Sequence, residues 1–413
     1  MKKERQLIGP FSQIVTMIGM PPAGAIADKD LEIITQGGLV LKNGIIVETG
    51  PFATLKRGAD PNKTEINEIK EELVLLPGLI DAHTHICYQG SRAAEYAMRM
   101  AGKSYLEIAK QGGGILDTVR QTRRASIADL AEGLRTRCSV LLADGITSCE
   151  VKSGYGLTVA DELKMLQAIR IVNDQHDIDL IPTALPAHVC PPEFDDPVAY
   201  IRKITAELLP EIARQKLSSR ADVYIDRDAF NAQQGRIYLD AAQKNGFSTT
   251  IHADQFSIAG SLLAAEYSAK SADHLEASGH REIELLAEHH VTGIVLPGAS
   301  LGLGQPFAPA RRMLDCGMTV AIASDWNPGS APMGDLLVQA CLIGAYEKLS
   351  LAETLAGITV RAAAALEYTD RGILSAGKKA DMIAFPCNNY MEIPYRQGKV
   401  KPVHVWKSGQ KVK

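Results

Sequence analysis

Residues 76–92 read LPGLIDAHTHICYQGSR, an apolar run that ends in two histidines, His83 and His85. In an extended strand, side chains two positions apart lie on the same face, so both imidazoles can bind one metal ion. The stretch therefore predicts a strand that carries half of a metal site at its end. The remaining ligands must come from other parts of the chain.

Apolar, β-rich runs recur from Leu76 onward and are separated by stretches with helical periodicity. The eight runs cover residues 76–85, 146–154, 179–190, 221–230, 248–256, 271–277, 291–300 and 318–329. One intervening stretch offers Ser126 as a helix cap, followed by Leu130 and Leu134 at helical spacing. Eight β-then-α units favour a closed (β/α)8 barrel of the TIM type, an α/β fold, over the alternative of a doubly wound open sheet.

The two ends of the chain differ from this middle part. GGLVLKNGIIVETGPF, within residues 1–75, has two short apolar runs around Lys42-Asn43-Gly44 and predicts a hairpin. Residues 372–413 have the same character. We expect a small β-sandwich domain assembled from 1–75 and 372–413, with the barrel of 76–371 inserted between them.

Composition restricts the class of protein. A chain of 413 residues with 46% hydrophobic and 22% charged residues is an ordinary globular sequence that can bury a large core. Its net charge of −4 gives no reason to expect a nucleic acid or membrane partner. The seven cysteines form no Cys-x-x-Cys pair, and neither a cleavable leader nor an apolar run of membrane-spanning length is recognisable, so we expect a cytoplasmic protein.

Other metal-binding residue types fall at the ends of the later runs. His252 lies in TTIHADQF, His274 in SADHLEA and Asp325 in VAIASDWNPGS. In a barrel of this type the carboxyl ends of all strands meet at one face, which also carries the chemistry. Three imidazoles from His83, His85 and His252 with the Asp325 carboxylate suit zinc, and also iron or manganese. His274 is then expected to face the water that the metal activates.

Several segments of the chain resemble the metal-dependent amidohydrolase superfamily. They are the 76–92 run, GSRAAEYAMRMAGKSYLEIAKQGGGIL, EVKSGYGL, PAHVCPPEF, IHADQFS, SADHLE and SDWNPGSAP. The resemblance implies hydrolysis of the cyclic amide C–N bond of 4-imidazolone-5-propanoate to N-formimidoyl-L-glutamate, the third step of histidine degradation. It also implies a homodimer.

The resemblance bears on the number of metal ions. Binuclear members of the superfamily often bridge two metals with a carboxylated lysine at strand 4, but ADVYIDRDAF contains no lysine. Lys152 lies on strand 2, where we interpret it as a structural or substrate-side cation. We therefore expect one divalent or trivalent ion, zinc or iron.

Two residues are predicted to be catalytic. Asp325 is expected to accept the proton of the nucleophile and pass it to the leaving ring nitrogen, and His274 to stabilise charge on the carbonyl oxygen. Some family members carry glutamate at the position of Gln255. Because a glutamine does not take up a proton at neutral pH, Gln255 is expected to bind substrate rather than to act as the base.

The substrate's carboxylate tail requires donors, because burial of an unpaired carboxylate is costly. Arg92 offers a bidentate fork for it. Tyr155 lies between two glycines, where it either reaches the substrate or anchors a loop, and His188 is a substrate hydrogen bonder by resemblance. In the loop after Asp325, the candidates for substrate binding are Asn327, Gly329 and Ser330.

Other functions remain open from the sequence. Another cyclic-amide hydrolase or a nucleobase deaminase of the same superfamily would share the metal site and differ only in its pocket. A non-catalytic assembly protein would be expected to lack one or more ligands. Gly112-Gly113-Gly114 lacks the Gly-Lys-Ser/Thr of a phosphate loop, and Lys103, Tyr105 and Glu107 indicate only a solvated helix face that covers the site.

Overall fold

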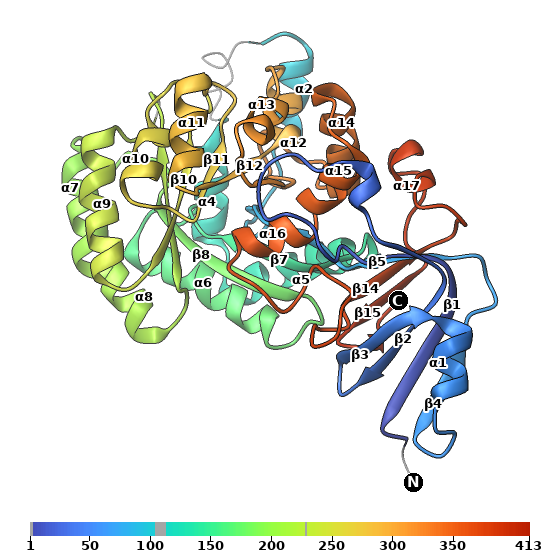
Figure 1. The fold of residues 1–413 in the computed structure, drawn as a ribbon. Coiled ribbons are helices and arrows are strands. Elements are labelled where there is room, and N and C mark those ends of the chain that lie inside the picture. Colours follow the sequence, from blue (N-terminus) through green and yellow to red (C-terminus); the bar gives the residue numbers. More distant parts are fainter. Residues whose placement is uncertain (1–2, 104–112, 228) are drawn as a thin grey trace.

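The computed structural model of the chain describes residues 3–103, 113–227 and 229–413, and it has two parts (Figure 1). The larger part is a barrel surrounded by helices. The smaller part is a sheet to which both ends of the chain contribute; in Figure 1 the C label lies on it and the N label just below it. The predicted combination of a barrel and a small β-domain from the two ends is confirmed.

Within the described residues, eight parallel strands form the barrel, in the order of the sequence. They are β6 (Leu79–Asp81), β7 (Ile146–Lys152), β8 (Asp179–Ala187), β9 (Arg220–Ile225), β10 (Ser248–Ala253), β11 (Ser271–His274), β12 (Thr292–Val295) and β13 (Val320–Ile322). The first and last strands meet just beyond their ends. There the Asp325 amide donates to the His83 carbonyl and the His85 amide donates to the Trp326 carbonyl, both at 3.0 Å. These bonds close the ring at the residues predicted to hold the metal.

The strands are shorter than the apolar runs that predicted them. The run at 318–329 contains only the three residues of β13, and the run at 291–300 contains the four of β12. The run at 318–329 continues into the loop that follows β13, whereas the run at 291–300 continues into the helix α12 (Pro297–Leu303). The run at 76–85 is divided, because β5 (Val74–Pro77) pairs in the small sheet and only β6 belongs to the barrel.

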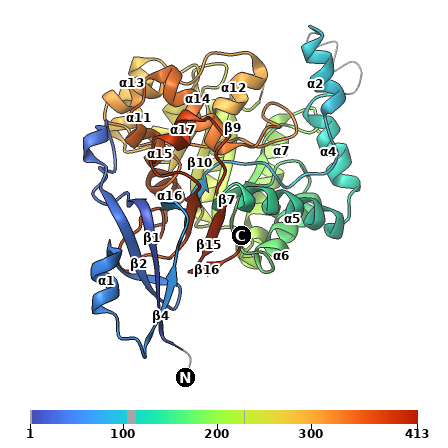
Figure 2. The same cartoon turned by 90° about the vertical axis from the view of Figure 1, so that its right-hand side faces the viewer.

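An outer layer of helices surrounds the barrel strands (Figure 2). These helices include α2 (Ala93–Met100), α4 (Ile115–Arg124), α5 (Ile127–Ala143), α6 (Val159–Asn173), α7 (Pro197–Lys203), η2 (Ile204–Leu208), α8 (Leu209–Gln215), α9 (Ala232–Lys244), α10 (Gly260–Glu266), α11 (His280–Glu288), α12 (Pro297–Leu303), α13 (Ala310–Asp315), α14 (Leu336–Glu347), α15 (Leu351–Gly357) and α16 (Val360–Ala365). The predicted cap of α5 is confirmed. Ser126 Oγ accepts from the Asp129 amide at 3.1 Å, and the Asp129 carboxylate accepts from the Ser126 amide at 3.0 Å.

The small sheet is mixed and continuous. Its strands are β1 (Arg5–Val15), β2 (Ile33–Lys42), β3 (Ile45–Pro51), β4 (Thr64–Glu68), β5, β14 (Met382–Phe385), β15 (His404–Lys407) and β16 (Gln410–Lys411), with the short helices η1 (Asp28–Asp30), α1 (Phe52–Gly58) and α17 (Glu392–Tyr395) nearby in the chain. Asn43 and Gly44 have φ values of 51° and 79°, as the turn of the predicted hairpin requires. The rings of Phe11 and Trp406, whose strands are not neighbours, are 6.2 Å apart, so the sheet folds back over its own core. The boundaries at 75/76 and 371/372 stay predictions.

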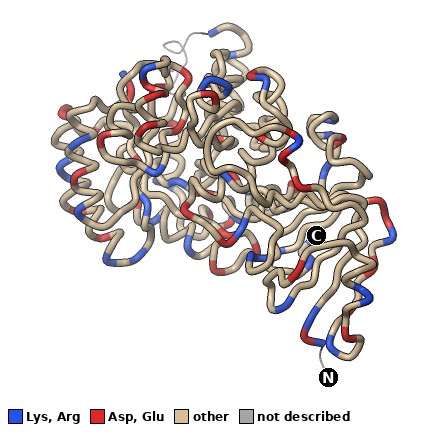
Figure 3. Tube along the Cα trace, viewed as in Figure 1, with Lys and Arg blue, Asp and Glu red and all other residues tan. Residues whose placement is uncertain are grey.

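Lysine and arginine alternate with aspartate and glutamate around the outside of the molecule (Figure 3). Among the described residues, no helix combines the length and the apolar character needed to cross a membrane.

Candidate metal centre

Four predicted ligands lie together at the carboxyl end of the barrel. Nε2 of His85 is 3.2 Å from Nε2 of both His83 and His252. Oδ1 of Asp325 is 3.6 Å from Nε2 of His83 and 3.5 Å from Nε2 of His85. All four side chains are buried. The arrangement joins the first, fifth and eighth strands of the barrel at one point.

The ring orientation of two of these histidines is set by carboxylates behind them. His83 Nδ1 is 2.6 Å from Oδ2 of Asp273, and His252 Nδ1 is 2.8 Å from Oδ2 of Asp222. A carboxylate at Nδ1 holds the ring proton there and leaves Nε2 with a free lone pair. Burial, together with neighbouring positive charge, also holds the pKa values of His83 and His85 well below their usual range.

The converging lone pairs fit one metal ion. Imidazole nitrogens about 2.0–2.1 Å from a tetrahedral zinc lie about 3.3 Å from one another, close to the separation of the Nε2 atoms here. Candidate ligand atoms of His83, His85 and Asp325 all lie within 4.8 Å of one another, and so do those of His83, His252 and His274. Without a cation, three neutral nitrogens would direct lone pairs at one another.

His274 lies beside this centre, in a strained backbone conformation. Its φ is 84° and that of Asp325 is 49°, values that non-glycine residues adopt at a cost and that concentrate at functional sites. His274 Nδ1 is 3.5 Å from Oε2 of Glu276, whose other oxygen accepts from Ser300 Oγ at 2.9 Å. Burial favours the neutral ring, but Glu276 and Asp325 outweigh it and raise the pKa of His274.

A cavity of about 310 Å³ opens above these residues. Its lining contains every residue that the sequence predicted to bind substrate: Arg92, Tyr155, His188, Gln255, Asn327, Gly329 and Ser330. His85, His252, His274 and Asp325 line it too, and so does Lys103. Tyr105, Glu107 and Gly112 lie outside the described residues.

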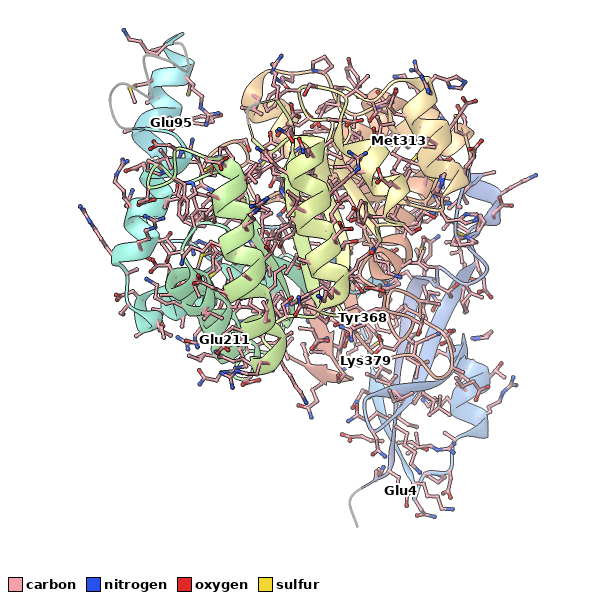
Figure 4. The ribbon with its side chains drawn as sticks, turned by 90° about the vertical axis from the view of Figure 1, so that its left-hand side faces the viewer. Glu4, Glu95, Glu211, Met313, Tyr368 and Lys379 are labelled. Atoms are coloured by element: carbon pink, nitrogen blue, oxygen red, sulfur yellow. The ribbon has the colours of Figure 1, made fainter. Side chains whose placement is uncertain are left out.

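Arg92 is paired within the protein, contrary to the free fork that the sequence suggested. Its Nε and NH2 donate to Glu95, at 2.8 and 2.5 Å. Glu95 lies one helical turn away in α2, near the upper edge of the barrel in Figure 4, whereas Glu211 is at the lower edge. The remaining nitrogen, NH1, lies against Gly329, where a Cβ atom would approach it to 2.3 Å. Glycine is therefore needed at 329 for the guanidinium to fit.

The loop after Asp325 is organised by its own asparagine. Asn327 Oδ1 accepts from the amides of Gly329 and Ser330, at 2.7 and 2.8 Å. Its Nδ2 donates to the Asp325 carbonyl at 2.7 Å and to Ser330 Oγ at 3.0 Å. The loop is also fastened to α2, because Arg99 donates to the Gly329 carbonyl. Asn327 thus shapes the loop that lines the cavity.

Tyr155 and His188 form an aromatic wall beside the metal ligands. His188 stacks on His85 with ring centroids 5.2 Å apart, and its Nδ1 is 3.0 Å from the Gly154 carbonyl. Burial is the main cause that lowers the pKa of His188 to about 3, so its ring is neutral. The turn that carries Tyr155 is held by the buried Glu162, which accepts from the amides of Gly154, Gly156 and Leu157 at 3.0, 2.7 and 2.8 Å.

Tyr224 was not predicted from the sequence. It lies near the end of β9, and its hydroxyl donates to Gln255 Oε1 at 2.7 Å. Glu95, Glu162, Asp222, Asp273 and Glu276 were missed as well. The sequence could have indicated Asp222 and Asp273, because each interrupts a short apolar run. A charged side chain in such a run is buried only if it has a partner.

Known proteins are similar to this chain over nearly its whole length. A sequence model described as the amidohydrolase family matches residues 74–412. The imidazolonepropionase of Geobacillus kaustophilus is 40% identical over 407 residues, which cover 97% of this chain and 96% of the relative. The imidazolonepropionase of Deinococcus radiodurans is also 40% identical, over 400 residues and 97% of both chains.

Solved structures show the same fold at low identity. An adenosine deaminase from Xanthomonas campestris, solved with bound zinc, has a TM-score of 0.71 and 18% identity over 98% of this chain and 92% of that one. A triazine hydrolase from Arthrobacter aurescens has a TM-score of 0.71 and 16% identity over 99% and 95% of the two chains.

Proposed function

The chain belongs to the imidazolonepropionases of the amidohydrolase family, and on that premise we propose that it hydrolyses 4-imidazolone-5-propanoate to N-formimidoyl-L-glutamate. The bond broken joins the ring carbonyl carbon to the adjacent nitrogen. The reaction is the third step of histidine degradation, and the enzyme is a hydrolase that acts on a carbon–nitrogen bond of a cyclic amide.

One observation carries this proposal: a single cavity is lined both by metal-ligand side chains and by a guanidinium. We call His83, His85, His252 and Asp325 the metal pole, and Arg92, Glu95, Arg99 and the loop 327–330 the tail pole. Both poles contribute to the lining of the same cavity of about 310 Å³. A substrate ring with a carbonyl group and a carboxylate tail can place the carbonyl at the metal pole and the carboxylate at the tail pole.

The four residues of the metal pole would hold one zinc or iron ion. When bound, such an ion supplies the nucleophile, since it lowers the pKa of water from about 15.7 to near 7. Asp325 accepts the proton of that nucleophile and delivers it to the leaving ring nitrogen. His274, with its pKa raised, donates a hydrogen bond to the carbonyl oxygen as charge develops there. Gln255 contributes a hydrogen bond to the ring.

At the tail pole, Arg92 meets the propanoate with NH1, because Glu95 occupies its other edge. Ser330 Oγ, which accepts from Asn327 Nδ2, donates its own hydrogen to the tail, whereas the Gly329 and Ser330 amides are already bound to Asn327 Oδ1. Tyr155 and His188 form the wall against which the ring lies. Charge-assisted hydrogen bonds of this kind orient the substrate and select a tail that is long enough to reach them.

We further propose that the enzyme works in the cytoplasm, which is supported by its seven unpaired cysteines. The homodimer that the resemblance implies also stays a proposal.

The test is an assay of product identity with metal-loaded protein. We expect N-formimidoyl-L-glutamate from 4-imidazolone-5-propanoate, and no ammonia from purines or pyrimidines and no ring opening of hydantoins. The variant Asp325→Asn serves as the negative control. Release of ammonia from a nucleobase, with no activity on the imidazolone, would replace this proposal with the deaminase alternative.

A further inference from the structure

Lys152 lies behind the metal pole and takes no part in the chemistry proposed above. It is the last residue of β7, and its side chain is fully buried in the barrel. Its Nζ is 2.8 Å from Oε2 of Glu150, 2.9 Å from Oδ2 of Asp222 and 3.5 Å from Oδ2 of Asp273. One ammonium group therefore contacts three buried carboxylates that come from three different strands.

Two of these contacts lead directly to metal ligands. The same Oδ2 of Asp222 that contacts Lys152 is 2.8 Å from Nδ1 of His252. The same Oδ2 of Asp273 is 2.6 Å from Nδ1 of His83. A lysine–carboxylate–imidazole chain thus runs twice from one ammonium to the metal pole.

The charges show why a cation is needed at this point. Glu150, Asp222 and Asp273 are fully buried, and buried carboxylates without a partner carry a large cost. Of these three carboxylates Arg220 approaches Glu150, with its Nε 3.7 Å from Oε1, while its NH1 donates to Glu367. Burial disfavours the ammonium form of Lys152, but the three carboxylates outweigh this effect and raise its pKa. Lys152 is therefore charged.

We propose that Lys152 is a positioning residue for the metal: its ammonium holds Asp222 and Asp273 in place, so that His252 and His83 direct Nε2 at the shared centre. The inference rests on the metal site of the proposed function. Of the two interpretations drawn from the sequence, it specifies the structural cation, because Lys152 is fully buried and is not part of the cavity lining. The carboxylate partners of metal-binding histidines typically change metal affinity about 10- to 100-fold when they are altered, and Lys152 acts on two of them.

The test measures the affinity of metal-free protein for Zn²⁺ alone, by competition with a chelator, together with equilibrium unfolding of the metal-free protein. Lys152→Met is expected to weaken zinc binding about 10- to 100-fold. Glu150→Gln is the matched control, since it removes a partner of Lys152 that contacts no metal ligand. Its zinc affinity is expected to stay within a few-fold of the parent value.

Lys152→Met leaves three buried carboxylates, so a variant without net change of charge is measured beside it. Glu150→Gln combined with Lys152→Met removes one charge of each sign and is expected to fold while it still binds zinc weakly. If this double variant binds zinc as tightly as the parent, Lys152 has no role in positioning. If the parent itself binds no zinc, the result contradicts the metal site and the proposed function rather than the role of Lys152 alone.

Discussion

The metal pole and the tail pole line the same cavity, but they are built in different ways. The metal pole stands on or directly after barrel strands, and carboxylates on other strands orient two of its histidines. The tail pole stands on α2 and on a loop, and its arginines are held by Glu95 and by backbone carbonyls. The register of the sheet fixes the first pole, whereas contacts between segments far apart in the sequence fix the second.

This difference has a kinetic consequence. Residues of the metal pole meet the reacting atoms, so their loss should lower kcat. Residues of the tail pole hold a part of the substrate that does not react, so their loss should mainly raise KM.

Replacement of Asp325 by asparagine should give the largest loss. The amide has nearly the same shape but cannot accept the proton of the nucleophile, so kcat should fall by about 10²- to 10⁴-fold. Steady-state kinetics with a parallel determination of bound metal would measure this. Near-normal turnover in a metal-replete variant would remove Asp325 from the proton transfer.

Replacement of Arg92 by methionine should raise KM about 10- to 150-fold, because a hydrogen bond to a charged group contributes about 1.5–3 kcal/mol. We expect kcat to change much less. The matched control is Arg236→Met, which breaks a comparable arginine–glutamate pair on the outer helices, with 2.7 Å between NH2 and Oε2 of Glu266 against 2.5 Å between Arg92 NH2 and Oε1 of Glu95. A fall in kcat with KM unchanged would place Arg92 with the metal pole instead.

Replacement of Glu162 by glutamine should have a smaller effect. It leaves at least one of the amides of the 154–157 turn poorly paired, at a cost of about 1 kcal/mol, and displaces Tyr155. KM should rise about fivefold and the melting temperature should fall. Glu211 is half-buried and lies at the opposite edge of the barrel from Glu95 in Figure 4, so Glu211→Gln is the control. An unchanged KM would show that the position of Tyr155 does not affect substrate binding.

Replacement of Ser126 by alanine should leave both poles intact. The loss of the α5 cap should lower the free energy of unfolding by about 1 kcal/mol, as measured by denaturant titration. The kinetic constants should equal those of the parent. A change in kcat would mean that the barrel transmits strain from its outer helices to the metal pole.

The sequence predicted the barrel and the residues of the metal pole because both follow from periodicity. His83 and His85 share a strand face, and parallel strands present their ends at one side of the sheet. The roles assigned to these residues stay predictions. Asp222 and Asp273 were missed because their partners come from other strands, and strand pairing brings them together only in three dimensions.

The contacts within the tail pole could not be predicted from periodicity. Arg92 and Glu95 are three residues apart on a helix, a spacing that permits an ion pair but does not require it. Glu95 also accepts from the Gly114 amide at 2.8 Å, a contact between segments 19 residues apart that no periodicity indicates. The loop from Asn327 to Ser330 was predicted to bind substrate with its polar groups. That the Asn327 side chain instead bonds to the amides of Gly329 and Ser330 depends on the folded shape of the loop.

Whether one metal ion at the metal pole is responsible for the activity is tested by titrating metal-free protein with Zn²⁺ or Fe²⁺ while the formation of N-formimidoyl-L-glutamate is followed. Activity should rise linearly and stop rising at one metal ion per chain, since the metal pole offers ligands for one. A rise that continues to two ions per chain, or full activity without added metal in protein shown to be metal-free, would contradict this prediction.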